Sequence, residues 1–378
     1  MKKYKIFAVI ILFIITIRMT DGYHLKNYTQ ANGYISVSSE ITMEVNTNRV
    51  LNSQNAEIKR PMASTTKVLT AITVIENNAD LSKTVEIKKS YTGIEGSSIY
   101  LQEGEKLTLK ELLYGLMLRS GNDCAVALAC ETSGSIEKFA ELMNSTAKKA
   151  GAENSNFVNP HGLHNDNHYT TAYDLARISC YAMKNPIFKE IVGTKSIKIS
   201  ALEGCRLLIN KNKMLNEYEG ATGIKTGFTK KAGRCLVSSA YRNGMEVVCV
   251  VLGCQPMFEE SKQLLNNAFN NYSYCEIFNA ENFNEKIKVA GTDAYCTLKT
   301  DSSFFYPLKK DEQSNIKVNI ICPEQIVPPF DENDIVGKVE IYYENQLLFS
   351  ENIYTIIGIK HKDYDYILKD IIAFWRII

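Results

Sequence analysis

The chain has 378 residues, of which 45% are hydrophobic and 22% charged, a composition that excludes a disordered or low-complexity protein. Lys and Arg total 43 against 42 Asp and Glu, which gives a formal net charge of +1. Without an overall positive field, nucleic acid is not expected as a partner. The length suits one large domain and a smaller one.

The N-terminus predicts export. Lysines at positions 2, 3 and 5 precede an apolar run over residues 6–17, and residues 20 and 22 are small, as a cleavage site requires. A helix of that run would reach about 18 Å, short of the roughly 30 Å hydrocarbon core. We expect a signal peptide over residues 1–22 and an extracytoplasmic protein. An uncleaved anchor is the alternative.

Residues 24–272 mix strand and helix patterns. Residues 34–51 alternate like two strands around a turn. Helical spacing of apolar residues is found at 64–77, 107–119, 123–131, 136–150 and 173–184. An Asn-Gly turn then joins strands over 234–241 and 246–252, and a helix follows over 259–269. The pattern predicts an α+β domain, with an antiparallel sheet flanked by helices.

Residues 276–355 lack helical periodicity. Short alternating segments at 286–290, 316–321 and 336–343 are separated by turn residues. A small all-β domain fits this pattern.

The last segment, residues 358–378, predicts an amphipathic helix. Apolar residues recur there at three- and four-residue steps: Tyr364, Ile367, Leu368, Ile371, Phe374, Trp375 and Ile378. Such a face suits the interface of a membrane, and the segment is too short and too charged to span one. We expect peripheral attachment to the outer face of the cytoplasmic membrane. Docking of this face on the β domain is the alternative.

Ten cysteines are present, but no C-x-x-C pair occurs. Several lie in apolar stretches, such as residues 247–251, where cysteine behaves as a small buried hydrophobe. A chain of this length does not need disulfides for stability. Mostly free, buried thiols are therefore favoured over a zinc site or a redox couple.

Residues 64–67 read S-T-T-K at the start of an apolar helix. Positions i and i+3 share a helix face, so the amine of Lys67 can reach the hydroxyl of Ser64. A serine hydroxyl becomes a good nucleophile only when a base takes its proton. The same spacing occurs at 135–138, 145–148 and 314–317, but only the copy at Ser64 opens an apolar helix.

That copy is followed by S-G-N at 120–122 and K-T-G at 225–227, each found once. S-x-x-K with an S-D-N-like element and K-T-G is the signature of penicillin-binding proteins and class A β-lactamases, and here the middle element reads S-G-N. Further runs match at 61–63, 96–98, 159–163, 171–174 and 225–229. Over nearly its whole length the chain resembles the D-alanyl-D-alanine carboxypeptidases, the low-molecular-mass penicillin-binding proteins of peptidase family S11. The resemblance implies a transpeptidase/β-lactamase-like catalytic domain and a small β-sandwich.

The resemblance also implies roles for the motif residues. Ser64 would be the acylated nucleophile and Lys67 its general base. Ser120 would help to relay a proton, and Asn122 would hold the substrate amide.

Lys225, Thr226 and Gly227 would form the far wall, where an amine and a hydroxyl suit the terminal carboxylate of the substrate. The oxyanion hole would consist of the backbone N–H groups of Ser64 and Phe228.

One departure concerns an arginine that many relatives carry shortly after the hairpin strand that follows K-T-G. Residues 253–258 contain none. Arg234 and Arg242 are the candidates to replace it.

The implied activity is that of a serine-type carboxypeptidase. It would remove the terminal D-alanine from peptidoglycan stem pentapeptides through an acyl-enzyme at Ser64, and β-lactam antibiotics would inhibit it by acylating the same serine. No cofactor is expected. No metal is expected either, because His161, His164 and His168 lack a nearby cysteine or acidic pattern that would complete a zinc site.

Two other functions are weighed against this one. A serine β-lactamase needs a glutamate that activates water, and no convincing E-x-x-N element precedes K-T-G. A non-catalytic wall-binding protein would not need the intact motifs.

Overall fold

The structure is a computed structural model that describes residues 38–359. The predicted signal peptide and nearly all of the predicted C-terminal helix lie outside these residues. Within them, no helix is long and apolar enough to cross a bilayer.

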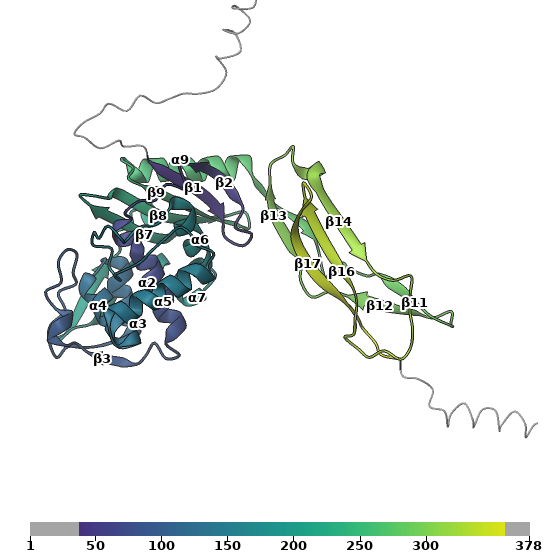
Figure 1. The fold of residues 1–378 in the computed structure, drawn as a ribbon, viewed down its shortest axis with the longest axis horizontal. Coiled ribbons are helices and arrows are strands. Elements are labelled where there is room, and N and C mark those ends of the chain that lie inside the picture. The colour runs from purple at the N-terminus through teal and green to yellow at the C-terminus, as the bar shows by residue number, and fades with distance from the viewer. Residues whose placement is uncertain (1–37, 360–378) are drawn as a thin grey trace, which may run out of the picture. The chain divides into compact units, whose positions relative to one another are not determined.

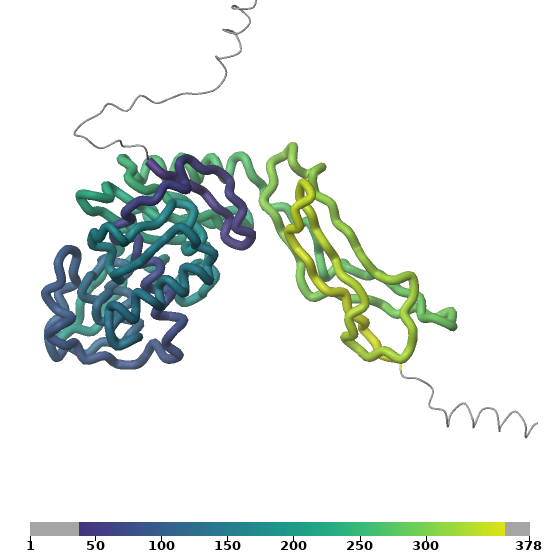
Figure 2. Tube along the Cα trace, in the orientation of Figure 1, coloured from purple at the N-terminus to yellow at the C-terminus, as the bar shows by residue number. Residues whose placement is uncertain are grey.

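Residues 38–272 are built on a five-stranded antiparallel sheet in the order β2-β1-β9-β8-β7. Its strands are β1 (Ser39–Glu44), β2 (Val50–Gln54), β7 (Ala221–Thr229), β8 (Gly233–Arg242) and β9 (Met245–Leu252). Strands from both ends of this part lie side by side, since Ser39 pairs with Leu252 (Figures 1 and 2). The sheet confirms the predicted hairpin at 234–252 and leaves β7 as an edge strand.

Most helices come from the chain between β2 and β7. They are η1 (Ala63–Thr66), α2 (Lys67–Asn77), η2 (Lys89–Tyr91), α3 (Leu109–Leu118), α4 (Asn122–Ser133), α5 (Ile136–Lys149), α6 (Ala172–Met183), α7 (Pro186–Gly193) and α8 (Met214–Glu217). Two strand pairs also lie in this stretch: β3 (Thr84–Glu86) with β4 (Lys106–Thr108), and β5 (Ser196–Ser200) with β6 (Cys205–Ile209). The structure differs from the helix predicted over 64–77 in one respect, because the segment opens with the 3₁₀ turn η1 before α2 begins.

Side-chain caps explain where several of these helices begin. Thr108 and Glu111 form a reciprocal capping box at the start of α3. The hydroxyl of Thr171 accepts the backbone N–H of Asp174 at the start of α6, where the sequence predicted a cap. Each cap satisfies backbone N–H groups that the first turn leaves unpaired.

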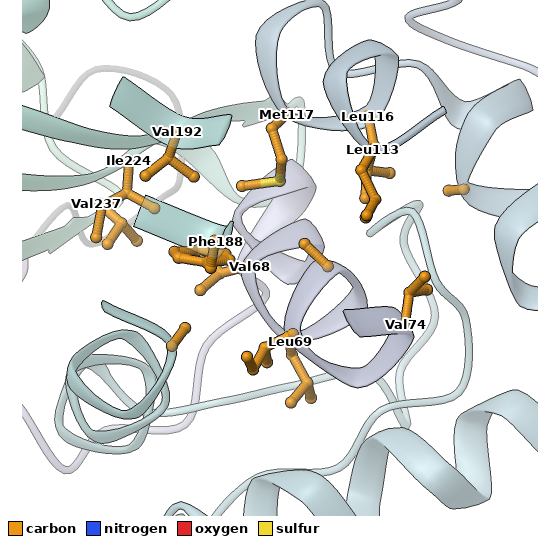
Figure 3. Close-up of a cluster of buried hydrophobic side chains, with 14 of the residues drawn as sticks. Val68, Leu69, Val74, Leu113, Leu116, Met117, Phe188, Val192, Ile224 and Val237 are labelled. Atoms are coloured by element: carbon orange, nitrogen blue, oxygen red, sulfur yellow. The ribbon is translucent and has the colours of Figure 1, made fainter. Parts of the chain in front are cut away.

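The sheet is covered on both faces. Leu264 and Leu265 of α9 (Met257–Asn271) pack with sheet residues such as Val251 on one face. On the other face, helix α2 is buried on nearly all sides (Figure 3). Its neighbours in this cluster are Leu113, Leu116, Met117, Phe188, Val192, Ile224 and Val237. This confirms the prediction that α2 is central to the core, and its burial fixes the turn η1, which carries Ser64, directly before its first residue.

Residues from 273 onward form an all-β part with a core of its own, which includes Ile287, Leu298, Val339 and Ile353. The strands are β10 (Ser273–Phe278), β11 (Lys286–Val289), β12 (Tyr295–Lys299), β13 (Phe304–Leu308), β14 (Ile316–Ile321), β15 (Gln325–Ile326), β16 (Ile335–Tyr343) and β17 (Gln346–Thr355), with a short turn η3 (Gln313–Asn315). Six of them form a sheet in the order β14-β16-β17-β12-β11-β15, and β10 pairs with β13. The predicted fold class is confirmed.

Candidate active site

Ser64 lies in the tight turn η1, directly before α2. It is half-buried, whereas the residues on both sides of it are buried. Two hydroxyls hold the turn: Thr65 Oγ1 donates to Met62 O at 2.6 Å, and Thr66 Oγ1 donates to Ala63 O at 2.8 Å. Ala63 has a φ of +51°, a left-handed conformation that a residue with a Cβ adopts at a cost. The turn therefore presents Ser64 alone to solvent.

The amine of Lys67 has three partners. Its Nζ lies 3.0 Å from Ser64 Oγ, 2.7 Å from Asn122 Oδ1 and 2.6 Å from the backbone oxygen of His161. The last two atoms can only accept hydrogen bonds. A neutral amine would donate its two hydrogens to them, which leaves its lone pair for the hydroxyl of Ser64. The arrangement suits a base that takes the proton of Ser64.

The surroundings favour that neutral amine. Burial, and secondarily the charge of Lys225, hold the pKa of Lys67 well below its usual value. Burial also lowers the pKa of Lys225 itself to about 7, with a further contribution from Lys211. Both shifts favour the unprotonated form of the amines at this site.

Ser120 lies between α3 and α4 and is only 4% exposed. Its φ is +66°, a second strained position at this site. Its hydroxyl has no hydrogen-bond partner among residues 38–359. A buried hydroxyl without a partner is costly, so this group is available to a substrate that enters the site.

Asn122 connects α4 to the loop that forms one wall. Its backbone N–H donates to Ser97 O at 2.7 Å, and its side-chain amide donates to Glu95 O. Gly96 has a φ of +91°, and a Cβ there would lie 2.8 Å from Asn122 Nδ2. The amide of Asn122 is thus fixed, with its oxygen directed to Lys67.

Asp123, which the sequence did not single out, anchors the same loop. Its fully buried carboxylate accepts the hydroxyl of Ser98 at 2.5 Å and the backbone N–H groups of Ile99 and Leu101. A carboxylate that accepts several hydrogen bonds is a strong organiser of a loop. The wall formed by residues 95–101 is therefore held from the first turn of α4.

The edge strand β7 forms the opposite wall. Lys225 is buried on it, and Thr226 is half-buried. A Cβ on Gly227 would lie only 3.1 Å from the backbone nitrogen of Ser64, so the strand packs against η1 at this point. Phe228 is the next residue along β7, so its backbone N–H also lies beside η1. Its side chain is 59% exposed.

Lys211 is a third lysine at the site, which none of the sequence motifs includes. Its Nζ lies 3.4 Å from Ser97 Oγ, and its charge lowers the pKa of both Lys67 and Lys225. Partial burial, and then Arg119, lower its own pKa. An isolated lysine in a loop carries no sequence signal that would have identified it.

The two candidate arginines lie at different ends of β8. Arg234 pairs with Phe228, and its guanidinium lies 5.4 Å from the centre of that ring. Arg242 instead donates to Glu219 O and lies 4.4 Å from the centre of the Tyr218 ring. Only Arg234 is therefore next to the K-T-G segment.

The other copies of S-x-x-K are explained by local structure. Ser135 is the N-cap of α5, and its hydroxyl accepts the backbone N–H of Lys138. Ser145 and Ser314 are exposed. None of the three has a buried lysine beside it.

The three histidines of the 161–168 loop do not share a site. His161 Nδ1 accepts the N–H of Leu163, and His168 contacts Thr66 and Val158. His164 lies 3.3 Å from Asp166 at the surface.

Another cluster could hold a metal ion: among the described residues, potential ligand atoms of Glu40, Cys254 and Glu260 lie within 4.8 Å of one another. Burial, reinforced by these carboxylates, raises the pKa of Cys254 to about 12. A thiol binds metal as a thiolate, which this environment disfavours. The ten cysteines are free in the structure, and six of them are buried.

The sequence matches two family models: D-alanyl-D-alanine carboxypeptidase over residues 26–256, and penicillin-binding protein 5, C-terminal domain, over residues 272–359. It is similar to the D-alanyl-D-alanine carboxypeptidase DacF of Bacillus subtilis, with 29% identity over 89% of each chain. The fold is similar to penicillin-binding protein 5 of Haemophilus influenzae (TM-score 0.70, 26% identity, 88% of this chain and 100% of that one). It is also similar to the Streptomyces K15 DD-transpeptidase (TM-score 0.58, 32% identity, 64% of this chain and 100% of that one).

Proposed function

The chain belongs to the D-alanyl-D-alanine carboxypeptidase family of serine hydrolases, and we propose that Ser64, Lys67 and Ser120 carry out its reaction. The observation that carries this assignment is the amine of Lys67, which is buried, 3.0 Å from Ser64 Oγ, and otherwise bound only to acceptors. The substrate is a peptidoglycan stem pentapeptide that ends in two D-alanines.

In the first step, Ser64 Oγ attacks the carbonyl carbon between the two D-alanines, and Lys67 takes the hydroxyl proton. The carbonyl oxygen becomes an oxyanion, which the backbone N–H groups of Ser64 and Phe228 stabilise. The C–N bond then breaks. The leaving amine takes a proton that passes from Lys67 through the unpartnered hydroxyl of Ser120. D-alanine departs, and water later hydrolyses the ester.

Substrate binding is assigned to the two walls. Asn122 holds a backbone amide of the peptide, and the edge of β7 offers unpaired backbone groups to an extended chain. Lys225 and Thr226 face the terminal carboxylate, while Gly227 keeps the strand close to η1. Arg234 is the arginine placed to assist them.

Covalent binding of penicillin is general to this family, and it gives the direct test of Ser64. The purified protein is incubated with penicillin, and separately with pentapeptide, and examined by mass spectrometry. We expect one penicillin adduct on Ser64 and release of D-alanine. The Ser64→Ala variant should lose both, and the matched Ser135→Ala variant should keep both. An adduct that persists in Ser64→Ala would contradict the assignment.

The same experiment separates the two alternatives. A β-lactamase would release hydrolysed penicillin with rapid turnover and leave pentapeptide intact, whereas a wall-binding protein would form no adduct. The match to the penicillin-binding protein 5 C-terminal domain supports the carboxypeptidase.

Enzymes of this family are periplasmic cell-wall enzymes. We assign export of this chain to residues 1–22 and peripheral membrane attachment to residues 364–378, on the sequence features described above. Deleting 364–378 from a chain that already lacks 1–22 should leave activity on soluble pentapeptide unchanged. In a flotation assay, it should move the protein from the liposome fraction to the free fraction. Equal flotation of both proteins would contradict the membrane assignment.

A further inference from the structure

A buried imidazole links the loop at 158–163 to the turn that carries Ser64. His168 is 3% exposed, and its Nδ1 accepts the backbone N–H of Val158 at 3.1 Å. The ring proton therefore sits on Nε2, which lies 2.8 Å from Thr66 Oγ1. Thr66 in turn donates its hydroxyl hydrogen to Ala63 O at 2.8 Å. A continuous chain of three hydrogen bonds thus runs from Val158 to the carbonyl of Ala63.

Each polar group along these three hydrogen bonds has a defined role as donor or acceptor. The neutral imidazole supplies one acceptor and one donor, and the hydroxyl of Thr66 accepts from His168 and donates to Ala63. Burial, together with the neighbouring His161, His164 and Lys67, lowers the pKa of His168 to about 3. The imidazole therefore stays neutral over the whole physiological range.

The carbonyl of Ala63 is also enclosed on its other side. A Cβ on Gly162 would lie only 1.9 Å from Ala63 O, so the backbone of the loop at 158–163 packs directly against this oxygen. Ala63 itself has the left-handed φ of +51°. Thr66 and Gly162 together hold it in the strained orientation.

The orientation matters because the peptide unit is planar. Ala63 C=O and Ser64 N–H belong to the same unit, so the direction of one determines the direction of the other. The N–H of Ser64 is one of the two donors assigned to the oxyanion. A donor there contributes to catalysis only if it points at the position where the charge develops.

We propose that His168 is a positioning residue for acylation, which acts through Thr66 on the Ala63–Ser64 peptide and so directs the N–H of Ser64 at the oxyanion. The proposal rests on the function assigned above, in which Ser64 is acylated. It also gives a role to a histidine that the sequence suggested only as a disfavoured metal ligand.

A neighbouring threonine provides a matched control. Thr70 lies one turn further along α2, is equally buried, and donates its hydroxyl hydrogen to Pro160 O at 2.7 Å. It therefore binds the loop at 158–163 directly and does not donate to the carbonyl of Ala63. Valine has nearly the shape of threonine without the hydroxyl. Thr66→Val therefore removes the hydrogen bonds to His168 and Ala63, and Thr70→Val removes the one to Pro160.

The test measures penicillin acylation under single-turnover conditions, which separates the noncovalent dissociation constant from the acylation rate constant. Active-site titration corrects for unfolded protein. We expect Thr66→Val to lower the acylation rate constant about 10- to 100-fold without changing the dissociation constant, because the N–H of Ser64 no longer points at the oxyanion. Thr66→Ser, which keeps the hydroxyl, should restore most of the rate. His168→Phe should resemble Thr66→Val.

Thr70→Val should acylate within about threefold of the parent although it also loses a buried hydrogen bond and therefore stability. The proposal is overturned if Thr66→Val acylates at the parent rate, if Thr70→Val loses as much as Thr66→Val, or if Thr66→Ser fails to recover. In all three cases the parent chain still acylates, so the assignment of Ser64 survives. If the parent itself forms no adduct, that assignment is wrong and this proposal is overturned with it.

Discussion

Lys67 Nζ and Ser64 Oγ lie 3.0 Å apart, with the lysine completely buried and the serine reachable from solvent. Burial is what makes this pair chemically useful, because an exposed lysine would stay protonated at neutral pH and could not accept a proton. The reactivity of Ser64 should therefore depend on everything that adjusts the protonation of Lys67.

Replacing Lys225 with glutamine should shift the pH profile of acylation. Acylation needs neutral Lys67, so the rate rises with pH through the pKa of Lys67 and then levels off. The positive charge of Lys225 lowers that pKa, and its removal should raise it. The rising limb of the acylation rate constant, measured with penicillin from pH 5 to 10, should move to higher pH.

The control for this shift is Lys211→Gln. The charge of Lys211 also lowers the pKa of Lys67, but it contributes less than that of Lys225. Removing it should therefore shift the profile in the same direction by a smaller amount. A shift to lower pH in either variant would show that Lys67 is not the group that titrates.

Gly162→Ala should abolish acylation. The Cβ would lie 1.9 Å from Ala63 O, a collision with backbone that cannot be relieved by a side-chain rotation. Gly134→Ala is the matched control, because Gly134 has the same φ of +87° but no neighbouring atom within 4 Å of the added Cβ. It should cost only the strain of a left-handed residue, about 1–2 kcal/mol, and keep the parent acylation rate. Similar activity in the two variants would argue against the packing of Gly162 on Ala63.

Thr73→Val should leave the protein as stable as the parent or more stable. Thr73 is completely buried, and its hydroxyl has no partner among the described residues, so the substitution removes an unsatisfied polar group. Thr70→Val should instead destabilise by about 1–2 kcal/mol, because it leaves the carbonyl of Pro160 without its donor. Urea unfolding of both variants measures the difference. Equal destabilisation would mean that Thr73 has a partner, such as a buried water.

Stability should fall as the pH is lowered from about 6.5 towards 4. The pKa of His168 is about 3 in the folded protein against 6.5 in an ordinary environment, and that of His161 is about 4. In this window the unfolded chain binds protons that the folded chain does not, so unfolding becomes more favourable as the pH decreases. Removing one of the two groups, in His168→Gln, should flatten the dependence of the unfolding midpoint on pH.

If His168→Gln keeps the parent slope, His168 is not buried in its neutral form.

Much of the architecture could be predicted because it rests on local rules. The i, i+3 spacing of Ser64 and Lys67, the Asn-Gly turn between β8 and β9, and the apolar periodicity of α2 each follow from the geometry of a single element. The same rules produced three other S-x-x-K spacings, and only the apolar helix and the later motifs distinguished the copy at Ser64 from a helix cap such as Ser135.

The remaining features of the site arise from packing between segments distant in sequence. The amine of Lys211 and the carboxylate of Asp123 belong to none of the motifs, and the motif that contains His161 gives no sign that its backbone oxygen accepts from Lys67. The lowered pKa of Lys67 likewise needs the burial and the nearby charges that only the assembled fold provides. Residue types and spacing thus pointed to the candidate reacting groups, whereas the tertiary structure decided the surroundings that set their protonation and the direction of their hydrogen bonds, since both depend on neighbours that chain order does not specify.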